Sequence, residues 1–199
     1  MDIITTVIIL ALSFLVGSIP FGIIVAKAKG VDLKKVGSGN IGATNVLRSL
    51  GKWPAAVTLL GDIMKGALAV ALGRYFGADV FHEGLFGIAA ILGHNFSIFL
   101  KFRGGKGVAT SLGVLLIYSP IVSCMTIALW LVVSVFTKYS SLGALLSFGL
   151  VPLNIFLLDF EHKEKLLIGV MITLLILIRH KDNMSRLTKG TERKIGQRE

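Results

Sequence analysis

The chain has 199 residues, of which 54% are hydrophobic and only 16% are charged, and its mean hydropathy is +0.80. A soluble globular domain carries about 25% charged residues and shows periodic rather than continuous apolar stretches. The composition therefore excludes an ordinary soluble domain and predicts an all-α, polytopic membrane helix bundle that forms a single domain over residues 1–199. The formal net charge of +10 does not by itself indicate a nucleic acid partner, and we expect none, because the distribution of the charge matters more than its sum.

Seven apolar segments are predicted to be membrane spans, each of which needs about 20 apolar residues. The first follows an acidic residue, Asp2, rather than a basic stretch, so we interpret it as a retained span and not a signal peptide. The fourth is short, and Pro120 predicts a break before the fifth, because proline disfavours helix in the residue before it. In chain order the predicted spans are 3–26, 53–76, 85–100, 108–119, 121–137, 142–158 and 165–179.

The distribution of basic residues predicts the orientation of these spans. With the N-terminus outside, most of the 21 Lys and Arg residues fall in the inner loops and the C-terminal tail, whereas Asp79, Glu83 and Asp159 fall outside. Because cytoplasmic loops of membrane proteins carry an excess of basic residues, we expect the seven transmembrane helices to have the N-terminus outside and the C-terminus cytoplasmic. Every loop with unusual polar residues lies on that cytoplasmic side.

The first inner loop, "VGSGNIGATNVLRSLG" (36–51), combines glycines with small hydrogen-bond donors. It contains a G-x-G-x-x-G pattern, but a membrane span precedes it rather than a strand, which excludes a dinucleotide-binding fold. Glycine amides can still turn toward an anion. The alternative is an ordinary polar loop. The candidate anion-binding residues are Ser38, Gly39, Asn40, Thr44, Asn45 and Arg48.

The second polar stretch, "KFRGGKGVAT" (101–110), leads into the fourth span. It is not a P-loop, because no glycine stands five residues before Gly105. Gly104, Gly105 and Gly107 nevertheless precede a helix N-terminus, which is suited to bind phosphate, and Lys106 would add a full charge. The alternative is a basic anchor that contacts lipid headgroups.

The third stretch, "IRHKDNMSRLTKGTE" (178–192), follows the last span. If the helix continues, Arg179, His180, Asn183 and Arg186 are spread along one of its sides; the alternative is a basic juxtamembrane helix on anionic lipid. The short loop "KYSSLG" adds Ser141 as a weaker candidate.

Polar residues also occur inside the predicted spans. Asp62 and Lys65 are spaced i, i+3, which predicts an ion pair directed toward the bundle interior. His94 is interpreted either as an interhelical hydrogen bond or as a functional group. The four histidines show no metal-ligand spacing, and Cys124 has no partner for a disulfide, so neither a metal nor a cofactor is expected.

Taken together, these stretches resemble the bacterial acyl-phosphate-dependent glycerol-3-phosphate acyltransferases, over nearly the whole chain. Small departures are Arg103, where the family more often has Lys, and Met184, where it more often has Ile. The motifs that carry the resemblance are "GSIPFG" (17–22), "GSGNIGATN" (37–45), "DIMKG" (62–66), "GHNFSIFLKFRGGKGVAT" (93–110) and "RHKDNMSRLTKGTE" (179–192).

The resemblance implies an enzyme of the first acylation step of phospholipid synthesis. It would transfer a fatty acyl group directly from acyl phosphate to the sn-1 hydroxyl of glycerol 3-phosphate, which gives 1-acylglycerol 3-phosphate (lysophosphatidic acid) and phosphate. The resemblance further implies the bacterial cytoplasmic (inner) membrane, an active site on the cytoplasmic side, and transient contact with a soluble enzyme that forms acyl phosphate. The His-x4-Asp pattern of the other large acyltransferase class is absent from the sequence.

On this hypothesis His180, Asn183 and Lys106 are the catalytic residues. Ser38, Gly39, Asn40, Thr44, Asn45, Arg48, Gly104, Gly105, Gly107 and Ser141 bind substrate phosphate. Either His180 or a phosphate oxygen of the substrate takes the hydroxyl proton, and we favour the substrate. The competing hypotheses are a membrane transporter of an organic phosphate, which would more commonly show an internal repeat, and a non-catalytic membrane anchor.

Overall fold

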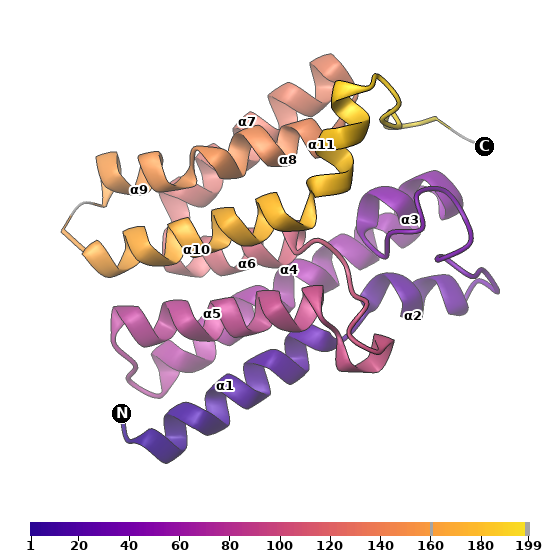
Figure 1. Cartoon of the computed structure of the whole chain (residues 1–199). Coiled ribbons are helices and arrows are strands. Elements are labelled where there is room, and N and C mark those ends of the chain that lie inside the picture. Colours follow the sequence, from indigo (N-terminus) through magenta and orange to yellow (C-terminus); the bar gives the residue numbers. More distant parts are fainter. Residues whose placement is uncertain (160, 198–199) are drawn as a thin grey trace.

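The computed structural model describes residues 1–159 and 161–197, and this part of the chain is built from helices without any strand (Figure 1). Five helical segments are long and apolar enough to cross a membrane, namely Ile3–Lys27, Lys52–Tyr75, Val80–Leu100, Pro120–Thr137 and Ser140–Leu158. The helices are α1 (Ile3–Ser18), α2 (Phe21–Lys27), α3 (Ala43–Leu50), α4 (Lys52–Tyr75), α5 (Val80–Asn95), the 3-10 helix η1 (Ile98–Leu100), α6 (Val108–Tyr118), α7 (Pro120–Thr137), α8 (Ser140–Gly149), α9 (Val151–Leu158), α10 (Lys163–Arg179) and α11 (Lys181–Thr188).

Prolines divide the apolar segments where the local geometry requires it. The predicted break at Pro120 is confirmed, because α7 begins at that residue. The first segment is also broken, at Ile19 and Pro20, and the sixth is broken at Leu150 shortly before Pro152. A proline has no N–H group and its ring is incompatible with the preceding helical turn, so each helix ends before it.

The structure differs from the sequence analysis at three places. The span predicted over 85–100 starts earlier in the structure, where the candidate span is Val80–Leu100. Its helix α5 begins at Val80, where the Asp79 side chain accepts a hydrogen bond from the His82 N–H, and ends at Asn95. The loop predicted over 36–51 contains the helix α3, which is strongly amphipathic and too short to give a clear periodic pattern. From the sequence, Arg179, His180, Asn183 and Arg186 are expected along one side on the condition that the last helix continues. It does not continue, because α10 ends at Arg179 and α11 begins at Lys181, after His180.

Helix α6 is shorter than a membrane span because the chain before it turns back along α5. The Gly104 N–H donates to the Asn95 carbonyl at 3.2 Å and the Gly105 N–H donates to the His94 carbonyl at 3.0 Å. Helix α6 therefore begins alongside the last turn of α5 and not at the level where α5 ends. Its 11 residues cover only about 17 Å, whereas the hydrocarbon core of a bilayer is about 30 Å thick.

Glycines let the central helices approach closely. A Cβ atom at Gly66 of α4 would overlap a carbonyl of α6, and one at Gly113 of α6 would overlap a carbonyl of α4. Gly17 and Gly93 have the same relation between α1 and α5. Small residues at such contacts are typical of helix packing in membranes, where apolar surface alone gives no preference for another helix over lipid.

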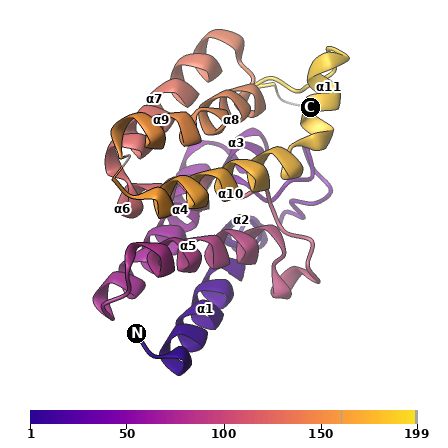
Figure 2. The ribbon, with the colours of Figure 1, turned by 60° about the vertical axis from the view of Figure 1, so that its left-hand side comes forward.

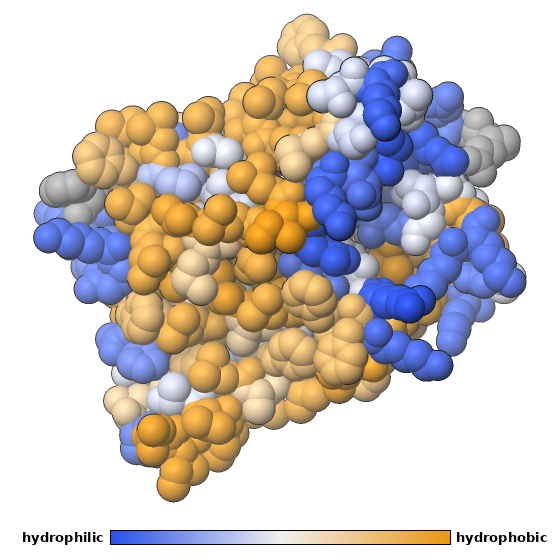
Figure 3. Space-filling model, in the orientation of Figure 1, coloured by the Kyte–Doolittle hydropathy of each residue, from blue (hydrophilic) through white to orange (hydrophobic). Residues whose placement is uncertain are grey.

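One end of the bundle is strongly polar, and the sides are largely apolar. Helix α1 lies at one side and α7 to α9 lie at the other, with α5, α6 and α10 between them (Figures 1 and 2). The two described ends of the chain lie at opposite ends of the bundle, and α2, α3 and α11 gather at the end near the C-terminus (Figure 1). Figure 3 shows most of the hydrophilic residues of the visible face at this end, a smaller hydrophilic group at the opposite end, and hydrophobic residues over the middle.

Candidate active site

A cavity of about 570 Å³ lies at the polar end, between α3, α4, α6, α7, α8 and α11. One part of its wall is polar and charged, and the other part is lined by aliphatic and aromatic side chains of α4, α6 and α7, among them Leu59, Leu112 and Trp130. Most of the predicted site residues are brought together here: Ser38, Asn40, Thr44, Asn45, Arg48, Lys106, Gly107, Ser141, His180 and Asn183 line the cavity, whereas Gly39, Gly104 and Gly105 do not.

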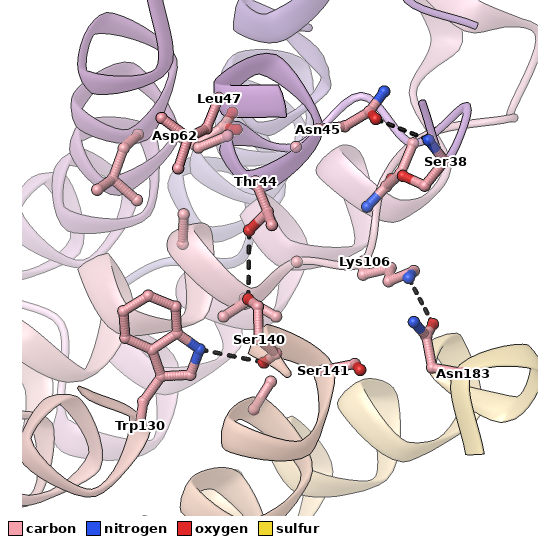
Figure 4. A pocket seen from close by; sticks show the side chains of 18 of the residues that line it. Ser38, Thr44, Asn45, Leu47, Asp62, Lys106, Trp130, Ser140, Ser141 and Asn183 are labelled. Atoms are coloured by element: carbon pink, nitrogen blue, oxygen red, sulfur yellow. Dashed lines mark hydrogen bonds between the residues drawn. The ribbon is translucent and has the colours of Figure 1, made fainter. Parts of the chain in front are cut away.

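Lys106 and Asn183 form the centre of the polar wall. The Lys106 Nζ donates to the Asn183 Oδ1 at 2.5 Å, which joins the loop before α6 to α11 across 77 residues of sequence (Figure 4). Burial lowers the pKa of the Lys106 ammonium to about 8, and the nearby Glu192 carboxylate limits this decrease. Near neutral pH the cavity thus presents a cation that is poorly solvated and available to an anion.

Glu192 organises the hydrogen-bond donors around this centre. Its Oε1 accepts from the Ser141 hydroxyl and from the Asn183 Nδ2, both at 2.6 Å, and its Oε2 accepts from the Arg186 Nε at 2.8 Å. The pKa of its carboxyl group is lowered by these hydrogen bonds, which outweigh the effect of burial. No role was assigned to Glu192 from the sequence, although this residue closes the motif "RHKDNMSRLTKGTE". The signal in the sequence was an acidic residue at the end of a mainly basic stretch.

His180 is buried at the junction of α10 and α11, with 2% of its surface exposed. Its Nδ1 lies 2.8 Å from the carbonyl oxygen of Ile176. A carbonyl only accepts, so the Nδ1 carries the ring proton and the Nε2 keeps a lone pair. Burial and the positive charge of Lys106 lower the pKa of His180 to about 4, so the imidazole is neutral at pH 7 and is a weak base.

The first loop is folded by Asn45, which is fully buried. Its Oδ1 accepts from the backbone N–H of Ser38 at 2.8 Å, and its Nδ2 donates to the carbonyls of Leu33 and Val36 (Figure 4). Asn45 therefore shapes the loop, while the Ser38 side chain is exposed at the cavity. Positive φ angles at Gly37 (57°) and Gly39 (69°) explain two of the glycines of the G-x-G-x-x-G pattern, since other residues rarely adopt them.

Arg48 and Thr44 of α3 tie distant segments to the cavity. The Arg48 guanidinium donates to the carbonyls of Arg193 and Lys194 at 3.0 and 3.3 Å, so the segment after α11 folds back over α3. The Thr44 hydroxyl lies 3.2 Å from the Ser140 hydroxyl of α8 (Figure 4). These contacts join α3 to α8 and to the segment after α11 beside the cavity.

The glycine turn before α6 has mainly a structural role in this geometry. The N–H groups of Gly104 and Gly105 are paired with carbonyls of α5, as described above, and their own carbonyls accept from the Arg179 guanidinium at 2.8 to 3.3 Å. Gly107 has a φ angle of 81° and precedes the first turn of α6. The first amides of a helix have no acceptor within the helix, and Val108 and Ala109 place this helix start at the cavity wall.

The ion pair predicted between Asp62 and Lys65 is confirmed, with a distance of 2.8 Å between the Lys65 Nζ and the Asp62 Oδ1. The interhelical hydrogen bond of His94 is also confirmed, because its Nδ1 lies 2.8 Å from the Lys65 Nζ. Within residues 1–159 and 161–197, no group of three or more His, Cys, Asp or Glu side chains is arranged to hold a metal ion.

Comparison with known proteins decides the family. The family model described as glycerol-3-phosphate acyltransferase matches residues 7–190. The chain belongs to the glycerol-3-phosphate acyltransferase family. Curated relatives of that name are 45% identical in Thermus thermophilus, over 95% of this chain and 94% of the relative, and 42% identical in Clostridioides difficile, over 100% and 99%.

Two crystal structures of PlsY (YgiH), an integral membrane glycerol 3-phosphate acyltransferase, have the same fold as this family member. Its glycerol 3-phosphate form superimposes with a TM-score of 0.91 at 37% identity, over 96% of each chain. Its lysophosphatidic acid form gives a TM-score of 0.89 at 36% identity, over 96% of this chain and 95% of the other. The family membership and the apolar helices together identify a multi-pass integral membrane protein.

Proposed function

We propose that this family member transfers a fatty acyl group from acyl phosphate to the sn-1 hydroxyl of glycerol 3-phosphate, and releases lysophosphatidic acid and inorganic phosphate. One observation carries the proposal: the cavity joins a cationic, donor-rich wall to an apolar wall in a single volume. A substrate with a phosphate head and a long acyl tail fits such a cavity, with the phosphate at Lys106 and the tail between α4, α6 and α7.

The reaction needs little covalent help from the protein, because acyl phosphate is already an activated mixed anhydride. The sn-1 oxygen attacks the acyl carbonyl carbon, a new ester C–O bond forms, and the C–O bond to the phosphate breaks. The protein contributes by holding the two substrates in line and by stabilising negative charge in a poorly hydrated cavity. Lys106, Arg48 and the first turn of α6 provide that stabilisation, with Ser38, Asn40 and Thr44 as further donors. The Ser141 hydroxyl joins them when its one proton turns from the Glu192 carboxylate toward the substrate.

His180 and Asn183 orient glycerol 3-phosphate in this proposal. The Nε2 lone pair of His180 accepts a hydrogen bond from the substrate hydroxyl. An imidazole with a pKa of about 4 is a weak acceptor for the proton of an alcohol. A phosphate monoester dianion is the stronger base, because the second pKa of the monoester is about 6. We infer that a phosphate oxygen of a substrate takes the hydroxyl proton and that His180 positions the hydroxyl.

The same proposal includes the topology and the cellular setting. The end near the C-terminus carries the polar loops and the basic residues, which supports a cytoplasmic location in a bacterial inner membrane. With α6 and α10 counted as spans, the chain crosses seven times with the N-terminus outside. A soluble enzyme that forms acyl phosphate would deliver its product to this face.

The direct test uses purified protein in detergent, with palmitoyl phosphate and glycerol 3-phosphate as substrates and phosphate release as the signal. We expect release that requires both substrates and that does not occur when acyl-CoA replaces acyl phosphate. A His180→Ala variant with a raised KM for glycerol 3-phosphate and a near-normal kcat supports substrate-assisted proton transfer. A collapse of kcat at unchanged KM contradicts it. Absence of release from folded protein, together with uptake of labelled glycerol 3-phosphate into sealed vesicles, would favour the transporter hypothesis.

A further inference from the structure

A buried charged network borders the cavity, which Asp62 and His94 help to line, and its members are not among the groups assigned above to the reaction. Lys65 and Asp62 of α4 each have 2% of their side chain exposed, and His94 of α5 has 5%. Burying a charge costs several kcal/mol even when it is paired, and an apolar pair of similar volume is often as stable. Packing alone therefore does not account for a buried ion pair between Asp62 and Lys65, and the contacts of Lys65 indicate a role in arranging the site.

Lys65 holds three separate segments at one point. Its Nζ lies 2.8 Å from the Asp62 Oδ1, donates to the Ile19 carbonyl at the break between α1 and α2 at 3.0 Å, and donates to the His94 Nδ1 at 2.8 Å. An ammonium group has three donors and no acceptor, so these contacts saturate it, and His94 carries its ring proton on Nε2. The Lys65 ammonium sets the tautomer, and it orients the imidazole together with the Asp62 Oδ1, which lies 3.5 Å from the same Nδ1.

The imidazole in turn supports the glycine turn. A Cβ atom at Gly105 would overlap the His94 Nε2, so the ring lies directly against this glycine. The Gly105 N–H donates to the His94 carbonyl, and the Arg179 guanidinium donates to the Gly105 carbonyl at 3.0 and 2.8 Å. The turn is therefore held between His94 and Arg179, and the next residue along the chain is Lys106.

We propose that Lys65 is a positioning residue of the reaction, which fixes the His94 ring behind Gly105 and thereby sets the place of the Lys106 ammonium at the cavity. The inference rests on the proposed function for its assay. The position of Lys106 matters because its Nζ contacts Asn183 through a single hydrogen bond of 2.5 Å. A displacement of the turn by about 1 Å would lengthen this contact to about 3.5 Å, where a hydrogen bond is weak. Misplacements of that size can cost about 100-fold in rate.

The test removes the ion pair without leaving an unpaired charge. The double variant Asp62→Asn, Lys65→Met keeps the volume of both side chains and loses the donors to His94 and Ile19. We expect kcat/KM for glycerol 3-phosphate to fall at least tenfold in folded protein. The matched control is Arg74→Met, Glu83→Gln, which removes the two-contact ion pair (2.8 and 3.1 Å) at the opposite end of the bundle.

The control variant should lose thermal stability but retain kcat/KM within about twofold, measured per folded molecule. Equal activity losses in the two double variants would overturn the positioning role, because a general loss of stability would then explain both. Normal kcat/KM in the Asp62→Asn, Lys65→Met variant would overturn it as well. Failure of the wild-type protein to release phosphate refutes the proposed function instead, so the two failures are distinguishable.

A double-mutant cycle asks whether Lys65 acts through Lys106. The Asp62→Asn, Lys65→Met pair is combined with Lys106→Arg, which keeps a cation of different length, and kcat/KM is measured together with the Kd for glycerol 3-phosphate. We expect the pair to cost at least tenfold when Lys106 is present and no more than about threefold in the Lys106→Arg background, because residues that act as one unit are not additive. The same fold loss in both backgrounds contradicts the inference.

Discussion

The substitution Lys106→Met removes the ammonium group at the centre of the polar wall while keeping most of the side-chain volume. Two interactions are lost: the 2.5 Å hydrogen bond to Asn183 and the attraction for the substrate phosphate. A hydrogen bond from a charged donor is worth about 1.5–3 kcal/mol, and a charge pair at about 4 Å contributes about 4 kcal/mol at an effective dielectric constant of 20.

These magnitudes translate into a loss of about 2–4 kcal/mol of transition-state stabilisation, or about 30- to 1,000-fold in kcat/KM. The assay is phosphate release from palmitoyl phosphate and glycerol 3-phosphate by protein purified in detergent. The control is Lys101→Met, which removes an exposed ammonium from the same loop and should change kcat/KM less than twofold. A loss below tenfold for Lys106→Met, at unchanged stability, would refute the assignment of Lys106 to the substrate phosphate.

The pH dependence of kcat/KM is a second test of the role of the Lys106 ammonium group. Burial lowers the pKa of Lys106 to about 8, so the lysine is charged below pH 8 and loses its proton as the pH rises through that value. Because kcat/KM reports the ionisation of the free enzyme, it should fall about tenfold per pH unit above pH 8. In a Lys106→Arg variant the guanidinium stays charged, and this alkaline decrease should disappear below pH 10.

Three further predictions concern single residues. Gly105→Ala should lower kcat/KM at least tenfold, because its Cβ would overlap the His94 ring, whereas Gly149→Ala, with open space around the added atom, should be silent in the same assay. Glu192→Gln should raise the KM for glycerol 3-phosphate several-fold in steady-state kinetics, because the donors that its carboxylate aligns lose their charged acceptor. Burial lowers the pKa of His180 from 6.5 to about 4, so between these pH values the unfolded chain binds a proton that the folded protein does not. The free energy of unfolding should therefore decrease by roughly 3 kcal/mol as the pH falls from 6.5 to 4. Thermal melts in detergent should show this decrease for the wild type and a weaker one for His180→Gln.

Local sequence determines much of the bundle. Continuous apolar segments mark the helices, and the proline at position 120 ends one of them, because both effects act within a few residues of the chain. The spacing of Asp62 and Lys65 was sufficient to predict their ion pair, since residues three apart share a helix face. The three polar stretches likewise predicted which side chains gather, although not how they pair.

Only the tertiary structure decided the arrangement of the site. Glu192 became the acceptor for Ser141 and Asn183 because the chain after α11 folds back over α3, a contact across many residues that no local pattern encodes. The amides of Gly104 and Gly105 were expected to face phosphate, yet they pair with carbonyls of α5, because the turn descends beside that helix. Periodicity and turn residues are local properties, whereas the partner of a polar group depends on which segments the packed bundle brings within 3 Å of it.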